Sequence, residues 1–246
     1  MQKKGTPRIG TSGYQYDHWK GRFYPEDLPK KNWFEYYARH FDTVEINNTF
    51  YNLPAESTFA KWHDAAPDNF RYTLKFSRYG SHVKHLNDPE NTIGMFLERS
   101  KPLKSFMGPI LVQLRPGWHF NPERLDGFLK KAPGTHRWAL EFRDRDWLRD
   151  ETFKILRKYN AALCIHDLIK DHPAVATADW VYLRFHGERK YRGIYSDPTL
   201  GKSAGKITEH LNNGLDVYAY FNNDENAYSV RNALTLKNMI GQRNKL

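Results

Sequence analysis

The sequence contains little of what marks secreted or membrane-bound proteins. Its single cysteine, Cys164, excludes an intramolecular disulfide framework and suits a reducing cytoplasm. No segment approaches the ~20 consecutive apolar residues that a membrane helix requires, and no apolar stretch follows the basic first residues. We therefore expect a cytoplasmic, unexported protein without a membrane partner. Because Cys164 lies within the apolar run ALCIHD, we expect a buried side chain rather than a nucleophile.

Long runs of one charge are also missing. The chain has 38 lysines and arginines against 28 acidic residues, which gives a formal net charge of +10. Its small basic clusters lie far apart, at Lys30-Lys31, Lys130-Lys131 and Arg189-Lys190. A positive excess favours anionic partners such as phosphorylated metabolites or nucleic acid. Because this excess is diffuse, it is more typical of a solvated surface than of a groove built for a polyanion.

The chain does contain eight short runs of β-branched and aromatic residues, each ending in polar or charged residues. Most stretches between them have helical apolar spacing, which indicates strand and helix repeated eight times. We predict an α/β fold of the (β/α)8, TIM-like barrel type, and the length suits one such domain over residues 1–246. The runs are RIGTSG, TVEIN, YTLKF, ILVQL, WALEFRD, LCIHD, VYLRFHG and VYAYFNND.

Helix boundaries can be predicted at several places. Asp88-Pro89 and Asn121-Pro122 each put a capping residue before a proline in the first helical turn. The last helix is predicted to begin at Asp224-Glu225, where carboxylates match the helix macrodipole. Between Lys170 and Asp179 we expect a loop or one short helical turn.

Ionisable and amide side chains at the carboxyl ends of the predicted strands point to a site. In a parallel barrel the strand interiors are filled by apolar side chains, so charged residues at the strand ends must pair, meet solvent or bind a ligand. We predict that these residues share one opening of the barrel. They are Glu45, Asn47, Lys75, Gln113, Glu141, Arg143, His166, Asp167, Arg184, His186, Asn222, Asn223 and Asp224.

These residue types suit general acid–base chemistry on an anionic small molecule, by a hydrolase or a lyase. Glu45 and Glu141 would act as base and acid, and Lys75 or His186 would stabilise developing negative charge. The anion would be held by the three arginines Arg143, Arg184 and Arg192.

Other interpretations of the same residues stay open. A satisfied ring of ion pairs needs no ligand, a Schiff base would use Lys75, and a paired-carboxylate glycosidase would use Glu45 and Glu141. The candidate metal donors are Glu45, Glu141, His166, Asp167 and His186. Because a lysine and two arginines oppose a metal cage and no HxxxH or CxxC spacing is present, we predict no metal and no cofactor, with a divalent metal as the lesser alternative.

The predicted loops add basic and aromatic groups. The loop after strand seven, HGERKYRGIYSD, contains Tyr191, Arg192 and Tyr195, and loops after strands seven and eight commonly hold phosphate in these barrels. Tyr14, Trp19 and Trp147 follow strands one and five, where they could stack on a base or a sugar. The alternative for each ring is packing that pins a long loop to the barrel.

A family resemblance covers nearly the whole chain. The series IGTSGYQYDHWKGRFYP, FDTVEINNTFYNLP, LEFRDRDW, ATADWVYLRFHG, YRGIYS and VYAYFNND resembles the YecE-like family, also called domain of unknown function 72, from about residue 8 to about residue 240. The resemblance implies a cytoplasmic (β/α)8-type barrel and no reaction. It also implies a likeness in outline to the xylose-isomerase and endonuclease-IV-like superfamily, which acts on sugars or damaged DNA with metals. Its recurring motifs include Glu45, Asn47, Glu141, Arg143, His186, Asn222 and Asp224.

Three function classes follow from these observations. The first is a barrel enzyme acting on a phosphate- or carboxylate-bearing small molecule. The second is a nucleic-acid-binding or DNA-repair-like protein that uses the aromatic and basic loops. The third is a non-catalytic ligand-binding protein, and the sequence predicts no oligomeric state for any of the three.

Overall fold

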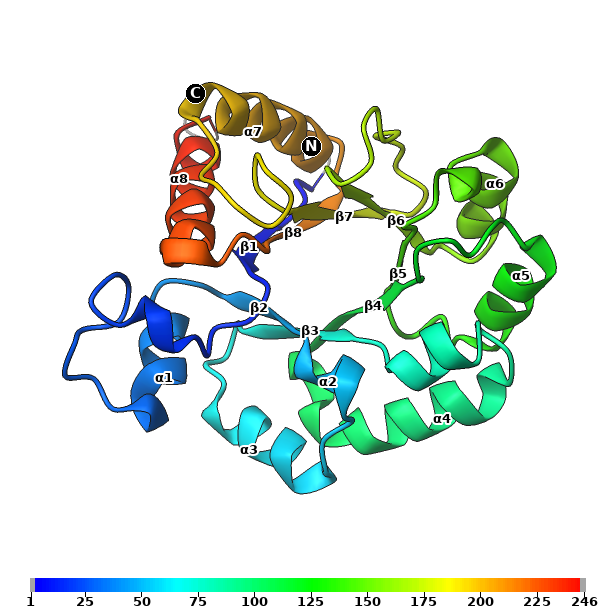
Figure 1. Ribbon diagram of the computed structural model, residues 1–246, viewed down its shortest axis with the longest axis horizontal. Coiled ribbons are helices and arrows are strands. Elements are labelled where there is room, and N and C mark those ends of the chain that lie inside the picture. The colour runs from blue at the N-terminus through cyan, green and yellow to red at the C-terminus, as the bar shows by residue number, and fades with distance from the viewer. Residues whose placement is uncertain (1–2, 244–246) are drawn as a thin grey trace. The chain divides into compact units, whose positions relative to one another are not determined.

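The computed structural model describes residues 3–243, which form two compact units of alternating strands and helices (Figure 1). Unit 1 comprises residues 3–45, 166–168 and 180–243. Unit 2 comprises residues 46–165 and 169–179. Each unit is described by itself below.

In unit 1, three strands pair in parallel in the order β1-β8-β7, and one parallel bridge joins β2 to the residue after β1. β1 pairs with β8 along its whole length, from Pro7 opposite Val217 to Thr11 opposite Phe221, and β8 pairs with β7. Ser12, directly after β1, forms a parallel bridge with Glu45. The elements are β1 (Pro7–Thr11), a 3₁₀ turn (Asp17–Trp19), a second 3₁₀ turn (Lys30–Asn32), α1 (Trp33–Ala38), β2 (Thr43–Ile46), β7 (Trp180–Phe185), α7 (Asp197–Asn212), β8 (Asp216–Phe221), a third 3₁₀ turn (Glu225–Ala227) and α8 (Tyr228–Arg243).

The helices of unit 1 bury one apolar face each. In Figure 1, α7 and α8 lie next to each other beside the strands. Spacings of three and four residues put the buried side chains of each helix on one stripe. Burying one leucine or isoleucine side chain contributes roughly 1.5–3 kcal/mol, so each stripe fixes its helix firmly. The buried residues are Leu200, Ala204, Ile207 and Leu211 of α7, and Val230, Ala233, Leu236 and Ile240 of α8.

In unit 2, the strands lie in the order β3-β4-β5-β6, again all parallel. Leu111 of β4 lies opposite Ala139 of β5, which lies opposite Ala162 of β6. The elements are α2 (Asn48–Tyr51), α3 (Glu56–Ala65), β3 (Arg71–Lys75), a π-helical turn (Tyr79–Val83), α4 (Pro89–Ser100), a 3₁₀ segment (Lys101–Phe106), β4 (Met107–Gln113), α5 (Pro122–Lys131), β5 (Trp138–Glu141), a 3₁₀ turn (Arg145–Trp147), α6 (Asp150–Lys158) and β6 (Ala162–His166).

The fold class is the predicted one. All eight predicted runs form strands, and the parallel strand order within each unit is that of an α/β, TIM-like (β/α)8 barrel. No helix separates β6 from β7, where a loop was expected after Lys170. Within residues 3–243, no helix combines the length and the apolar character needed to cross a membrane.

Three predicted helix starts have different outcomes. Asn121 is a true N-cap, because its side chain accepts from the Arg124 backbone N–H at 3.0 Å before Pro122 opens α5. α4 begins at Pro89 as predicted, but Asp88 does not cap it. Asp88 has a left-handed backbone (φ 58°), whereas a capping residue has an extended one. The predicted start of the last helix at Asp224-Glu225 was wrong, because positive φ angles at Asn226 and Ala227 interrupt the chain before α8.

Candidate functional site

The predicted site residues are divided between the two units. Glu45, Arg184 and His186 lie in unit 1, whereas Lys75 and Glu141 lie in unit 2. Within each unit the structure brings several of them into direct contact. That the side chains of both units share one opening stays a prediction.

Glu45 of β2 is the centre of a buried polar group in unit 1. Its Oε1 accepts a hydrogen bond from Arg184 Nη2 at 2.7 Å and another from the Ser12 hydroxyl. Its Oε2 accepts from the Tyr182 hydroxyl at 2.5 Å. Glu45 is 0% exposed and Arg184 2% exposed, so two charges are removed from water and neutralise each other. Both carboxylate oxygens are therefore already occupied.

A second group in unit 1 consists of Asp167, His186 and Tyr195. Asp167 Oδ1 lies 3.0 Å from His186 Nδ1, and the carboxylate also accepts from the His186 backbone N–H at 3.0 Å. The Tyr195 hydroxyl donates to Asp167 Oδ2 and accepts from the Gly187 N–H at 2.6 Å. His186 is fully buried, while the Asp167 side chain keeps 34% of its surface exposed. The imidazole is therefore held in one orientation by a carboxylate that still meets solvent.

The protonation of this group follows from its contacts. Burial raises the pKa of Asp167, but the hydrogen bonds from His186 and Tyr195 outweigh burial, so this pKa lies below its usual value. Burial, and next the Asp167 charge, raise the pKa of Tyr195, which keeps its hydroxyl protonated and able to donate. A carboxylate can only accept, so Nδ1 of His186 carries the proton and the neutral ring has its lone pair on Nε2.

His166 is protonated on the other ring nitrogen from His186. Its Nδ1 accepts from the Leu168 N–H at 3.2 Å, so the neutral ring carries its proton on Nε2. The rings of His166 and His186 lie edge to face with centroids 5.9 Å apart. Two buried histidines with different protonated nitrogens thus lie side by side at the ends of their strands.

The basic loop after β7 continues directly from His186. The Tyr191 ring lies edge to face with His186 at 5.3 Å, and Arg189 pairs with Arg192 through the backbone. Arg189, Lys190 and Arg192 are exposed. Gly187 makes the turn: its φ is 90°, and a Cβ there would lie 2.3 Å from the Arg192 carbonyl oxygen. Only glycine therefore allows the loop to fold back next to the histidine.

The residues after β8 hold this loop in place. Asn223 is fully buried, and its Nδ2 donates to the Gly193 carbonyl oxygen at 2.8 Å and to Asn232 Oδ1 at 3.1 Å. The Asn222 backbone N–H donates to the Phe185 carbonyl oxygen at 2.7 Å. Asp224 contributes its carbonyl oxygen, which accepts from the Trp19 indole at 3.1 Å. Asn223 thus holds this loop, while Asn222 and Asp224 contact β7 and Trp19; that these three residues contact a ligand stays a prediction.

The aromatic side chains after strands one and five are packed inward. Trp19 in unit 1 and Trp147 in unit 2 are both 0% exposed. The Trp147 indole donates to the Trp118 carbonyl oxygen at 2.5 Å, and its ring stacks on Phe142. Tyr14 is also buried, which raises its pKa to about 12. This burial supports the packing alternative for these three rings.

In unit 2, Glu141 and Arg143 form the main ion pair. Arg143 Nε donates to Glu141 Oε1, and Arg143 Nη2 donates to Gln113 Oε1 at 3.2 Å. Glu141 is fully buried at the end of β5, and Cys164 Sγ lies 3.9 Å from its Oε2. Cys164 is buried, as predicted.

Lys75 of unit 2 has aromatic neighbours and a histidine that sequence analysis missed. The Lys75 ammonium lies 4.3 Å from the centre of the Phe50 ring, and that ring lies 4.9 Å from His82. Burial, and next the charges of Lys75, Arg78, Arg115 and Arg143, lower the pKa of His82 to about 4. None of His82, Arg78 and Arg115 lies in a strand, so no strand period predicts the direction of these side chains. Asn47 is half-buried and directly precedes α2.

The candidate donors for the alternative metal site do not form a cluster in the described part of the chain. Among residues 3–243, no three histidine, cysteine, aspartate or glutamate side chains form a group that could hold a metal ion. Glu45 and Glu141 each bind an arginine instead. The donor set of each unit therefore suits ion pairing better than metal coordination.

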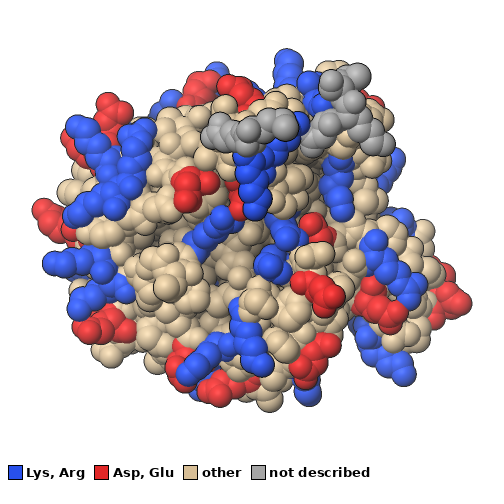
Figure 2. All heavy atoms as spheres, turned by 180° about the vertical axis from the view of Figure 1, so that it is seen from behind, with Lys and Arg blue, Asp and Glu red and all other residues tan. Residues whose placement is uncertain are grey.

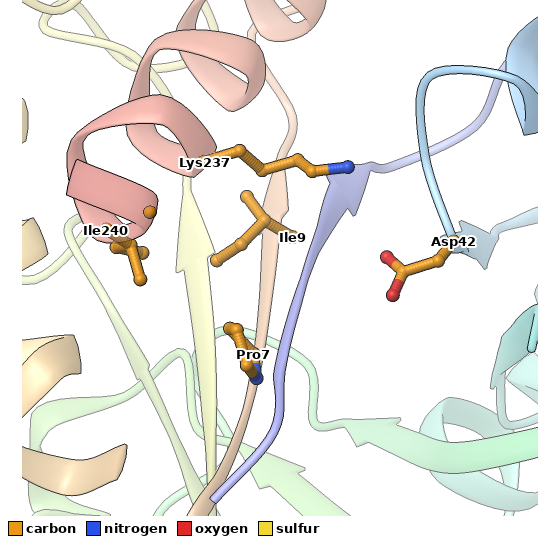
Figure 3. Close-up of a pocket in the computed structure, with 6 residues that line it drawn as sticks. Pro7, Ile9, Asp42, Lys237 and Ile240 are labelled. Carbon is orange, nitrogen blue, oxygen red and sulfur yellow. The ribbon is translucent and has the colours of Figure 1, made fainter. Parts of the chain in front are cut away.

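A cavity of about 130 Å³ lies in unit 1 beside β1 and α8 (Figure 3). The Lys237 ammonium donates to the His40 carbonyl oxygen at 2.7 Å, and Asp42 pairs with Arg8 at 3.0 Å. Burial lowers the pKa of Lys237, and Asp42 opposes this effect. Because both charged groups already have partners, we assign no ligand to this cavity. Its lining residues are Pro7, Ile9, Asp42, Lys237, Ile240 and Gly241.

Comparison with known sequences identifies similar proteins. A family model described as "Protein of unknown function DUF72" matches residues 8–246. The UPF0759 protein YecE of Escherichia coli (strain K12) is 35% identical over 112 residues, and the protein of the same name from Escherichia coli O157:H7 matches equally. This match covers 44% of the chain and spans 40% of the length of these curated relatives.

Solved structures resemble the chain over nearly its whole length. A DUF72 family protein of Thermotoga maritima MSB8 matches with a TM-score of 0.86 and 27% identity, over 96% of this chain and 99% of that one. A DUF72 family protein of Enterococcus faecalis V583 matches with a TM-score of 0.80 and 20% identity, over 96% of each chain. At that identity the second likeness shows the fold alone.

Proposed function

This chain belongs to the DUF72 family, as its motifs predicted, and because that family is described only as proteins of unknown function, we propose an activity from the side chains of unit 1. The protein is an enzyme that moves a proton on an anionic small molecule, with His186 as the acid–base residue. The hydrogen bond between Asp167 and His186, next to a basic loop, is the observation that carries this proposal.

His186 suits proton transfer better than Glu45 does. Both oxygens of Glu45 accept hydrogen bonds from buried groups, so Glu45 would have to break a contact before it could take a proton. His186 is oriented through Nδ1 by a carboxylate that stabilises the imidazolium when Nε2 accepts a proton. Asp167 and Tyr195 are then positioning residues, because they act through the ring.

The basic loop supports an anionic substrate. Arg189, Lys190 and Arg192 are exposed within a few residues of His186, and guanidinium groups match the oxygens of phosphates and carboxylates. A positive charge close to the reacting atoms also stabilises the negative charge that develops when a proton is removed. We therefore propose a hydrolase or a lyase that acts on a phosphate- or carboxylate-bearing compound.

The nucleic-acid alternative has weaker support. On the face seen in Figure 2, lysine and arginine side chains are scattered among acidic ones and form no continuous stripe. Trp19 and Trp147, two of the rings considered for stacking on bases, are fully buried. A single-strand binder needs exposed rings along a basic groove, so we do not propose nucleic acid as the ligand.

Turnover by a histidine variant tests the proposed function. A panel of phosphate monoesters and small carboxylates is assayed with the wild type, with His186→Gln, and with His119→Gln as a control at an exposed histidine. We expect the wild type to turn over at least one compound. His186→Gln should lower kcat by about 10²- to 10⁴-fold, the usual contribution of a general acid–base, whereas His119→Gln should leave it unchanged.

Two results would overturn the proposal. One is a wild-type protein that converts no member of the panel. The other is a folded His186→Gln variant that keeps wild-type turnover, with folding checked by circular dichroism.

A further inference from the structure

We propose that unit 2 contains an oxyanion site at the carboxyl end of β3, where Lys75 and His82 bind inorganic phosphate and select it over sulfate. The proposal does not depend on the acid–base role of His186. It follows from the position of a lysine, the hydrogen bonds of a histidine and the shape of the loop between β3 and α4.

The lysine is fixed at the end of its strand. Lys75 is the last residue of β3 and is only 7% exposed, with its ammonium 4.3 Å from the centre of the Phe50 ring. The Thr49 hydroxyl donates to the Lys75 carbonyl oxygen at 2.7 Å, which ties α2 to the end of the strand. Because the aromatic ring already fixes the lysine ammonium, binding an anion costs the lysine side chain little conformational entropy.

His82 joins this lysine through the same ring. Its imidazole lies edge to face with Phe50 at 4.9 Å and is half-buried. Arg78, Arg115 and Arg143 are also close enough for their charges to lower the pKa of His82, which is about 4. These positive charges all act on one neutral ring, so an anion with two charges bound beside that ring is attracted by each of them.

The hydrogen bonds of His82 indicate which anion fits. The Ser81 hydroxyl donates its one proton to the Ser77 carbonyl oxygen at 2.8 Å, so it can only accept from His82 Nδ1, 3.0 Å away. The neutral ring therefore has its lone pair on Nε2, which accepts a hydrogen bond. Doubly charged inorganic phosphate keeps a hydroxyl that can donate to this nitrogen, whereas sulfate has none. The positive charges therefore attract both ions, but only phosphate can donate a hydrogen bond to His82 Nε2.

The backbone of the loop is unusual in a way that suits a binding site. Residues Tyr79–Val83 form a π-helical turn, and His85, Leu86 and Asp88 all have positive φ angles. Such turns and left-handed residues are rare and cluster at functional sites. Gly80 allows the turn to approach its neighbours, because a Cβ there would lie 2.5 Å from the Phe76 ring.

Calorimetric titration of the whole protein with inorganic phosphate and with sulfate, at one ionic strength and pH 7.5, tests the proposal. We expect phosphate to bind at least about tenfold more tightly than sulfate, since an acceptor that loses water without gaining a donor costs about 1 kcal/mol or more. His82→Ala should remove the preference and leave similar, weak binding of both ions. Lys75→Met should weaken both, and the charge-matched control Lys154→Met, at an exposed position of α6, should weaken neither.

The comparison of the two ions in the wild type needs no variant, so a misfolded mutant cannot obscure it. Phosphate that does not bind, or that binds no more tightly than sulfate, overturns the proposal. So does a preference for phosphate that persists in His82→Ala, or phosphate binding as tight in Lys75→Met as in the wild type. Weakened phosphate binding in Lys75→Met and a lost preference in His82→Ala, while His186-dependent turnover persists, would separate this inference from the proposed enzymatic function.

Discussion

Replacing Glu45 with alanine is expected to lower the free energy of unfolding by about 3–5 kcal/mol, the usual cost of removing one partner from a buried ion pair. The substitution takes away the carboxylate that neutralises the buried Arg184 guanidinium and that accepts from the hydroxyls of Ser12 and Tyr182. Urea denaturation followed by circular dichroism measures the effect.

A double variant provides the control. Glu45→Met combined with Arg184→Met removes both charges and keeps apolar volume, so it should be closer to the wild type in stability than Glu45→Ala is. If Glu45→Ala lowers the free energy of unfolding by less than about 1 kcal/mol, the value typical of exposed ion pairs, then Glu45 and Arg184 do not form a pair buried away from water.

Asp167→Asn is expected to lower turnover by about 10²- to 10⁴-fold while the protein still folds. The asparagine amide can present its NH₂ group to His186 Nδ1, which would force the proton of the ring onto Nε2. The nitrogen that should accept the substrate proton would then carry one already. Steady-state kinetics on the compound found for the wild type measures the loss.

Tyr195→Phe is the matched control for this positioning effect. It removes the hydroxyl that donates to Asp167 but leaves the carboxylate on the ring, so its loss of turnover should be smaller than that of Asp167→Asn. If the order is reversed, or if Asp167→Asn keeps wild-type turnover, Asp167 does not position His186 for catalysis.

The depressed pKa of Asp167 also predicts a dependence of stability on pH. The hydrogen bonds to the ionised carboxylate stabilise the folded state fully above the unfolded pKa of about 3.9, and this contribution is lost as the pH falls through the lower folded value. Asp167→Asn should remove this component of the acid-induced loss of stability. Urea denaturation at several acidic pH values compares the two proteins.

The strands could be predicted because their pattern is local. Each run of β-branched and aromatic residues ends in polar residues, and all eight of these runs form strands. The start of α5 was equally predictable, because Asn121 and Pro122 supply a cap and a first turn within two residues. Asp88-Pro89 looks the same in sequence, but Asp88 has a left-handed backbone, and its carboxylate accepts from Asn91 Nδ2 at 2.7 Å instead of capping a backbone N–H.

The pairing of the polar residues could be predicted only in part. The two-residue period of a strand puts Tyr182 and Arg184 on one face of β7, but nothing local indicates that both would bind Glu45. Tyr182 lies inside the apolar run VYLRF, where only its hydroxyl indicates a polar contact. His82 was missed because the π-helical turn that places it has no sequence signature of its own.

Nitrogen-15 NMR of the histidine rings in the wild-type protein, at a pH where His186 is neutral, tests the central claim most directly. A proton on Nδ1 of His186, with Nε2 unprotonated, is the result that an orienting Asp167 carboxylate requires. A proton on Nε2 instead would mean that Asp167 does not hold the ring, and the proposed acid–base role of His186 would be contradicted.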